Sequence, residues 1–131
     1  PYPGIPQLLE HLQNAGVLLA VASNKYQAAT GKLIAHFFPG IRFAAVLGQR
    51  EGIPAKPDPA VVREILLFTG VNPADTLYVG DSGVDMQTAS QSGVTACGVT
   101  WGFRSREELE GYAPGYIADR AEEIQQIIFE A

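Results

Sequence analysis

The sequence predicts an α/β fold in which a parallel sheet carries helices on both faces. Continuous apolar runs at residues 17–22, 76–80 and 94–99 have the length and composition of buried strands. Segments with helical spacing of apolar residues lie between them, so strand and helix alternate along the chain. This alternation requires crossover connections and therefore a parallel sheet. No repeat or linker divides the sequence, and we expect one domain over residues 1–131.

Apolar spacing and capping residues place the individual elements. Helices are expected at residues 5–15, 25–38, 59–69 and 83–92. Strands are expected at residues 17–22, 43–47, 76–80, 94–99 and 116–118. The glycines expected to end helices are Gly16, Gly70 and Gly93. The capping boxes expected to open two final helices are Ser105 with Glu108 and Asp119 with Glu122.

Composition and charge exclude several classes of protein. With 14 acidic and 9 basic residues, the formal net charge of −5 argues against nucleic-acid and anionic-membrane partners. A lone Cys97 excludes an internal disulfide framework and a cysteine zinc cluster, and we expect its thiol to be buried. The longest apolar run is far shorter than the ~20 residues that span a bilayer. Since no signal peptide is present, we expect a soluble, cytoplasmic protein, although a chain that opens on Pro1 need not begin at its natural start.

The first buried strand runs directly into Ser23, Asn24 and Lys25. In parallel sheets, ligands bind at the carboxyl ends of the strands, so these residues are candidates for a binding site. A hydroxyl followed by free backbone N–H groups at a helix start can hold an anion such as phosphate. A simple N-cap role for Ser23 explains the same pattern equally well.

A second candidate site follows the strand that ends at Gly80. Asp81 and Asp85, four residues apart in a glycine-containing turn, offer oxygen ligands that can converge on one hard cation. The structural alternative is that Asp81 or Ser82 caps the following helix and that Asp85 pairs with a neighbouring basic residue. The local sequence favours neither interpretation over the other.

Lys56 lies between these two sites, in a proline-rich stretch. Pro57 restricts the backbone beside it, and Asp58 with Pro59 predicts the N-cap and first residue of a helix. An ammonium group held in so rigid a frame can neutralise a phosphate oxygen and nearby carboxylates, whereas the ordinary interpretation is a surface lysine. Together the three segments fit a phosphate beside a divalent metal.

The ordered set of motifs resembles the haloacid dehalogenase-like (HAD) hydrolase superfamily, most closely its phosphoglycolate phosphatase-like branch. The segments that carry the resemblance are Tyr2-Pro-Gly-Ile5, Val21-Ala-Ser-Asn-Lys25, Lys56-Pro-Asp-Pro59, Gly80-Asp-Ser-Gly-Val-Asp85 and Gly98-Val-Thr-Trp-Gly-Phe-Arg104. The resemblance covers essentially the whole chain and implies a Rossmann-like core. Each motif alone is weak, but their order at successive predicted strand ends is specific.

The resemblance also implies roles for individual residues. Ser23, helped by the Asn24 backbone, is expected to bind the transferring phosphoryl group, and Lys56 matches the lysine of the third motif. Asp81 is expected to bind Mg²⁺, with Asp85 supporting the metal through water or hydrogen bonds. Lys56 and Asp81 are therefore the expected catalytic residues.

One departure from the family pattern is large. The family's first motif, an Asp-x-Asp that supplies the nucleophile and the acid/base, occurs nowhere in the 131 residues. The chain therefore resembles the C-terminal part of a HAD phosphatase, without the helical cap and without the first strand. By the resemblance, that strand belongs in the middle of the sheet, between the strands at 17–22 and 76–80. We expect the gap either to close or to be filled by a strand from another chain, as in strand exchange or a dimer.

The expected function is Mg²⁺-dependent hydrolysis of a small phosphorylated metabolite, with phosphoglycolate as the leading candidate. The resemblance implies an aspartyl-phosphate intermediate, so the chain by itself is expected to be inactive. The alternative is a non-catalytic module that binds phosphate or a partner protein and has dispensed with the nucleophile. Retention of Ser23, Lys56 and Asp81 favours the enzyme, because a degenerate site has little physical reason to keep all three.

Overall fold

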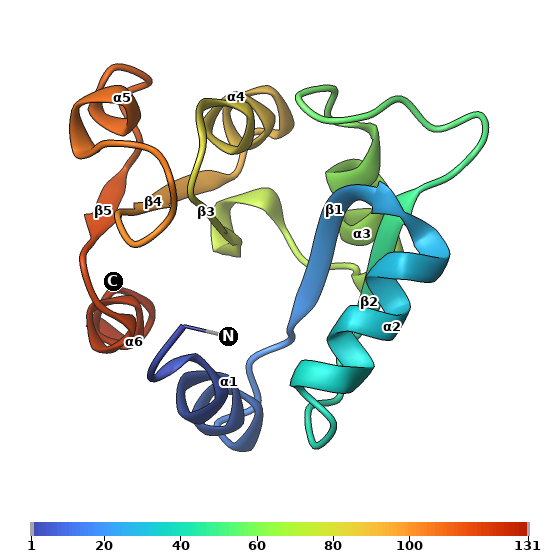
Figure 1. Ribbon diagram of the computed structural model, residues 1–131, viewed down its shortest axis with the longest axis horizontal. Coiled ribbons are helices and arrows are strands. Elements are labelled where there is room, and N and C mark those ends of the chain that lie inside the picture. The colour runs from blue at the N-terminus through green and yellow to red at the C-terminus, as the bar shows by residue number, and fades with distance from the viewer. Residues whose placement is uncertain (1, 131) are drawn as a thin grey trace.

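The computed structural model describes residues 2–130 and confirms the alternation of helices and strands (Figure 1). The helices are α1 (Ile5–Asn14), α2 (Gln27–Phe37), α3 (Ala60–Thr69), the 3-10 helix η1 (Pro73–Asp75), α4 (Gly83–Ser92), α5 (Arg106–Glu110) and α6 (Ala121–Glu130). The strands are β1 (Ala20–Tyr26), β2 (Ala45–Gln49), β3 (Leu77–Gly80), β4 (Thr95–Val99) and β5 (Tyr116–Ala118). None of the helices in this part of the chain is long and apolar enough to cross a bilayer.

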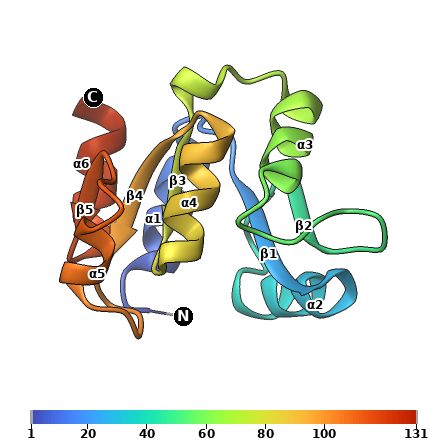
Figure 2. The same cartoon turned by 90° about the horizontal axis from the view of Figure 1, so that it is seen from above.

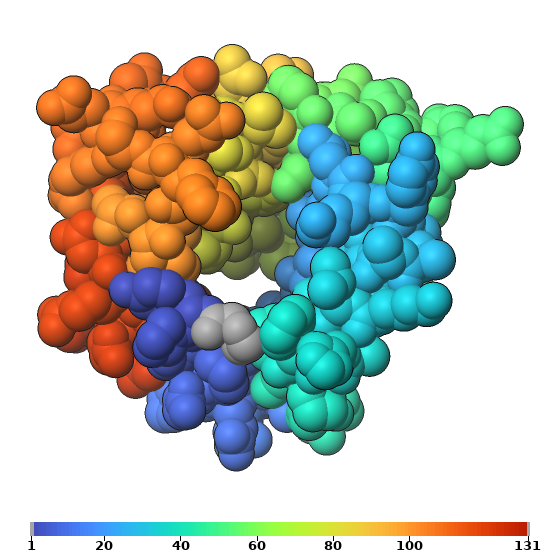
Figure 3. Space-filling view, in the orientation of Figure 1, coloured from blue at the N-terminus to red at the C-terminus, as the bar shows by residue number. Residues whose placement is uncertain are grey.

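The strands form two parallel sheets rather than one. One sheet has the order β1-β2 and the other the order β3-β4-β5. Within residues 2–130, no strand pairs with the free side of β1 or with the free side of β3. We call the space between these two strands the sheet gap; it lies where the family resemblance places the absent first strand. Figure 3 shows an opening in this face of the molecule, bordered by the N-terminal segment, the β1–β2 half and the half that contains β3.

Alternate residues of β4 point into two hydrophobic cores, one on each face of the three-stranded sheet. Figure 2 shows α4 in front of this sheet and α1 behind it. Cys97 and Val99 point into a core that α1 and α6 cover. Ala96 points into the other core, where Met86 of α4 and Leu109 of α5 are almost completely buried. The prediction that helices cover both faces of a parallel sheet is therefore confirmed. Burial of the Cys97 thiol is also confirmed, and this burial raises its pKa to about 11.

The first strand differs most from its prediction. The apolar run at 17–22 predicts a strand buried on both faces, but β1 begins at Ala20 and continues to Tyr26, and none of its residues is fully buried. The physical reason is the sheet gap, because β1 has a neighbouring strand on one side only. The helix predicted at 25–38 consequently begins two residues later, at Gln27.

Most of the predicted helix ends are confirmed. Gly70 and Gly93 follow α3 and α4 with φ of 73° and 74°, a left-handed conformation that favours glycine. The Ser105 hydroxyl accepts a hydrogen bond from the Glu108 N–H at 3.1 Å. The capping box predicted at Asp119 is wrong in its partner, because Glu123 rather than Glu122 accepts the Asp119 N–H.

The free side of β3 generates a prediction about amide hydrogen exchange. The Thr95 N–H donates to the Thr76 carbonyl. With the register between β3 and β4, this bond means that the backbone N–H of Gly80 points toward β4 and the backbone N–H of Val79 points toward the sheet gap. In the monomeric chain, the Val79 amide is expected to exchange at least roughly tenfold faster than the adjacent Gly80 amide. Residue-resolved exchange measured by NMR tests this expectation, and equal protection of the two amides in a dilute monomer would contradict it.

Candidate functional site

An ion pair between Lys56 and Asp85 lies at the centre of the candidate site. The Lys56 Nζ is 2.8 Å from Asp85 Oδ1, and the two side chains are only 11% and 13% exposed. The same ammonium donates to the Tyr78 hydroxyl at 3.0 Å and to the Ala22 carbonyl at 3.2 Å. Because Ala22 belongs to β1 and Tyr78 to β3, the ammonium joins the two sheets across the sheet gap.

Asp85 is fully hydrogen-bonded by the protein. Its Oδ1 accepts from Lys56 and from the Tyr78 hydroxyl, and its Oδ2 accepts from the Asp81 N–H and the Ser82 hydroxyl. Burial raises the pKa of Asp85, but the hydrogen bond and charge of Lys56, with the bonds from Tyr78 and Ser82, outweigh burial and hold this pKa below its usual range. The structural alternative for Asp85, a pair with a neighbouring base, is thus what the structure contains. Its supporting role at a metal stays a prediction.

The backbone of Lys56 is held by the side chain of Asn24. The Lys56 N–H donates to Asn24 Oδ1 at 2.9 Å, and Asn24 Nδ2 donates to the Lys56 carbonyl at 3.3 Å. The Lys56–Pro57 peptide is cis, and the Asp58 carboxylate accepts from the Ala60 N–H at the start of α3. The Asn24 side chain therefore fixes the lysine loop, which leaves the Asn24 backbone as the part expected to bind phosphate.

Ser23 lies in an irregular part of β1, where the register against β2 shifts between Ala22 and Tyr26. The Ser23 hydroxyl accepts a hydrogen bond from the Lys25 N–H at 3.0 Å. The alternative in which Ser23 is a helix N-cap is wrong, because α2 begins at Gln27 and its N-cap residue is Tyr26. Ser23 directly follows Ala22, whose carbonyl accepts a hydrogen bond from Lys56. The role of Ser23 in binding phosphate stays a prediction.

Asp81 lies in the same turn as Asp85 but has a different environment. Its N–H donates to Asp85, but its half-buried carboxylate accepts no hydrogen bond from the described residues. The backbone of Gly102 packs against this carboxylate so closely that a Cβ at residue 102 would overlap it. A free carboxylate suits a hard cation such as Mg²⁺, which takes oxygen ligands. The fit is incomplete, since residues 2–130 contain no group of three or more His, Cys, Asp or Glu side chains able to hold a metal.

Two residues of the site were not singled out from the sequence: Tyr78, and Gly102, which appeared only within the segment at residues 98–104. Tyr78 is one residue of an apolar strand and follows no motif; its role depends on Lys56 and Asp85 arriving beside it from other segments. Burial, followed by the charge and hydrogen bond of Asp85, raises the pKa of Tyr78, so its hydroxyl keeps its proton at neutral pH. Gly102 is required because the loop after β4 passes the Asp81 carboxylate.

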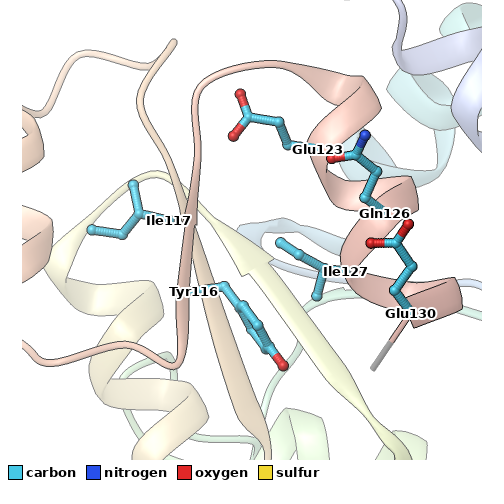
Figure 4. A pocket seen from close by; sticks show the side chains of 6 residues that line it. All are labelled: Tyr116, Ile117, Glu123, Gln126, Ile127 and Glu130. Carbon is cyan, nitrogen blue, oxygen red and sulfur yellow. The ribbon is translucent and has the colours of Figure 1, made fainter.

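Two other features lie outside this site. A hollow of about 310 Å³ between β5 and α6 is lined by residues of those two elements, including Tyr116, Ile127 and Glu123 (Figure 4). None of the candidate residues Ser23, Lys56 and Asp81 lines this hollow. Arg104, which the sequence leaves open as a surface or substrate contact, is 58% exposed at its side chain and lies 3.7 Å from Glu108.

The fold and the arrangement of these motifs define a class of protein. The chain matches the haloacid dehalogenase-like hydrolase family over residues 1–99, and it belongs to that family. This result confirms the expected family, and the alternating strands and helices fit the expected Rossmann-like α/β core.

Individual relatives narrow the resemblance to the phosphoglycolate phosphatases. The chain is 32% identical over 118 residues to the phosphoglycolate phosphatase of Pseudomonas putida strain KT2440, covering 90% of this chain and 43% of that protein. It is 36% identical over 110 residues to the phosphoglycolate phosphatase of Mesorhizobium japonicum, covering 84% of this chain and 48% of that protein.

A solved structure shows the same fold. A crystal structure from Lactobacillus delbrueckii subsp. bulgaricus, provisionally described as a phosphoglycolate phosphatase, is 40% identical and superposes with a TM-score of 0.92. The superposition covers 98% of this chain and 53% of that one. The chain thus spans about half the length of the relatives it matches.

The buried ion pair generates a prediction about stability. Replacing Lys56→Met keeps much of the side-chain volume but leaves the Asp85 carboxylate without its counter-charge, which is expected to lower the free energy of unfolding by about 3 kcal/mol at pH 7. The matched control Lys32→Met, at an exposed lysine of α2, is expected to change it by less than about 0.5 kcal/mol. Urea denaturation measures both.

The same pair fixes the pH dependence of this loss. Since the pKa of Asp85 is lowered in the folded state, its stabilising contribution is present above the ordinary carboxyl pKa and is lost as the pH falls through the folded value. The difference between wild type and Lys56→Met should therefore shrink as the solution is acidified. A difference that stays constant or grows toward acid pH would contradict the assigned role of the pair.

Proposed function

We propose that this chain forms the phosphate-binding half of a Mg²⁺-dependent phosphatase that hydrolyses a small phosphate monoester, with phosphoglycolate as the leading candidate. The observation that carries the proposal is the convergence of three segments at the Lys56 ammonium. Lys56 donates to the carbonyl of Ala22, the residue before Ser23. It also donates to the carboxylate of Asp85, which belongs to the same motif as Asp81. The names of the relatives support phosphoglycolate as the substrate.

The residues of this chain would divide the work of binding and charge stabilisation. The Ser23 hydroxyl and the N–H groups that follow it would hold the phosphoryl oxygens, and Lys56 would offset their negative charge. Asp81 would hold Mg²⁺, which when bound supplies positive charge beside the phosphoryl group and its attacking oxygen. Asp85 would keep Lys56 and the Asp81 turn in place.

The complete reaction needs a nucleophile that these 131 residues do not contain in the family's motif. In the reaction we propose, a carboxylate oxygen attacks phosphorus, the bond from phosphorus to the ester oxygen breaks, and the acid/base residue of the absent motif donates a proton to the departing alcohol oxygen. Water then hydrolyses the acyl phosphate, which releases inorganic phosphate and restores the carboxylate. Since Asp-x-Asp is absent from the sequence, the chain alone is expected to bind phosphate without turning over an ester.

Phosphate binding tests the first half of this proposal. Titration of the chain with inorganic phosphate, followed by amide NMR, should shift the signals of Ser23, Asn24 and Lys25. The variant Ser23→Ala should weaken binding by roughly tenfold to a hundredfold, the value of one hydrogen bond to a charged group. The control Ser90→Ala, at an exposed serine of α4, should bind phosphate like the wild type. Shifts confined to other parts of the chain would contradict the proposed site.

Turnover tests the second half. The pure chain with p-nitrophenyl phosphate and Mg²⁺ is expected to show no activity above that of its Asp81→Asn variant. Mg²⁺ alone should bind weakly, because Asp81 provides too few ligands for an ion that takes six oxygens and usually keeps several waters. Metal-dependent turnover that disappears in Asp81→Asn, or tight stoichiometric Mg²⁺ binding, would show that the nucleophile and metal site are complete within these residues.

We also propose a strand from a second polypeptide, either an exchanged segment or a dimer contact, as the partner that fills the sheet gap. The unpaired backbone of β3 at Val79 supports the proposal, because a parallel strand can pair with such an edge. As chain concentration rises, sedimentation should detect association, and the Val79 amide should become protected in the associated form. Association that leaves Val79 exchanging as in the monomer would place the contact elsewhere.

A further inference from the structure

We propose that Tyr78 is a positioning residue for Lys56, holding the ammonium group in the sheet gap before a phosphate arrives. The inference rests on the proposed function, in which Lys56 offsets phosphate charge, but its structural basis is independent of that function. The Tyr78 hydroxyl oxygen is 3.0 Å from Lys56 Nζ and 3.0 Å from Asp85 Oδ1. It is therefore a corner of the triangle that the ion pair forms.

The hydrogens in this triangle can be assigned without ambiguity. A carboxylate only accepts, so the single Tyr78 hydrogen goes to Asp85 Oδ1 and the phenol oxygen is left to accept from Lys56. The ammonium has three hydrogens and three protein acceptors, namely Asp85, the Ala22 carbonyl and Tyr78. Tyr78 thus provides the third acceptor and completes the set.

Tyr78 is well placed to fix a flexible side chain. Its backbone is held in β3 by pairing with Ala96 of β4, and its ring packs against the core that contains Met86 and Leu109. The lysine side chain is a flexible four-carbon stem, whereas the tyrosine ring is held by its strand and by the core. The phenol oxygen therefore defines the position of the ammonium group.

The arrangement determines what a phosphate must do to bind. All three ammonium hydrogens are engaged, so a phosphate oxygen gains one only by displacing a protein acceptor. Asp85 is the charged acceptor at the shortest distance, and the neutral oxygens of Tyr78 and Ala22 are the easier ones to displace. Tyr78 consequently holds the ammonium at the site, yet its hydrogen bond from Lys56 can be replaced by one from Lys56 to a phosphate oxygen. This arrangement is a form of preorganisation.

The variant Tyr78→Phe tests the proposal, because it keeps the ring and removes only the hydroxyl. In ¹⁵N-labelled chain, the Lys56 ammonium signal should be observable in the wild type, where protein acceptors slow hydrogen exchange, and should broaden or disappear in Tyr78→Phe. The dissociation constant for inorganic phosphate should rise by about fivefold to tenfold. The control Tyr116→Phe, on β5, should leave both quantities unchanged.

Each outcome decides between the two proposals. A Tyr78→Phe chain that keeps the wild-type ammonium signal and phosphate affinity would overturn the role of Tyr78. If the wild type binds no phosphate, the proposed function fails, while the ammonium signals still decide whether Tyr78 positions Lys56.

A second measurement tests the proposal if the Tyr78→Phe variant does not fold. Incorporation of 3-fluorotyrosine weakens the phenol as an acceptor without removing it, and should move the Lys56 ammonium signal. An unmoved signal would count against the proposal.

Discussion

One ammonium group joins two sheets that share no strand pairing. Lys56 lies on the loop between β2 and α3, and its three hydrogen bonds reach β1, β3 and α4. A buried ion pair is expensive to desolvate, and it is tolerated only where geometry is good and the remaining polar atoms are satisfied. Here both oxygens of Asp85 and all three hydrogens of Lys56 have protein partners, so the pair meets that condition.

The two aspartates of the same turn differ because of this pair. The Asp85 carboxylate accepts hydrogen bonds from Lys56 and from the backbone of its own turn. The Asp81 carboxylate, in contrast, has no hydrogen-bond donor among residues 2–130. Gly80 and Gly102 make the arrangement possible, since a Cβ at residue 80 would overlap Asp85 and one at residue 102 would overlap Asp81. Asp85 builds the site and Asp81 is left available to a ligand.

The sequence could predict those parts of the molecule that local pattern determines. The strand at 76–80, the helix at 83–92 and their glycine boundaries follow from apolar spacing and capping alone, and all are present. The apolar run at 17–22 predicted the burial and the bounds of β1 poorly, because burial of a strand depends on neighbouring strands that the run itself does not specify. Ser23 and Asp81 could be singled out because each follows a predicted strand, and Lys56 because it lies in a rigid, proline-rich stretch before a predicted helix. Tyr78 was not, because its function arises only when distant segments meet at its hydroxyl.

The site and the incomplete sheet are the same place in the molecule. Lys56 binds the Ala22 carbonyl on β1 and the Tyr78 hydroxyl on β3, which are the two strands that border the sheet gap. A strand that entered the gap parallel to β1 and β3 would run between these groups, and its carboxyl end would lie at the edge where Ser23 and Asp81 lie. Its residues there would meet Lys56 directly, so completing the sheet and completing the chemistry would be one event. A site assembled across a gap of this kind depends for its geometry on whatever fills the gap.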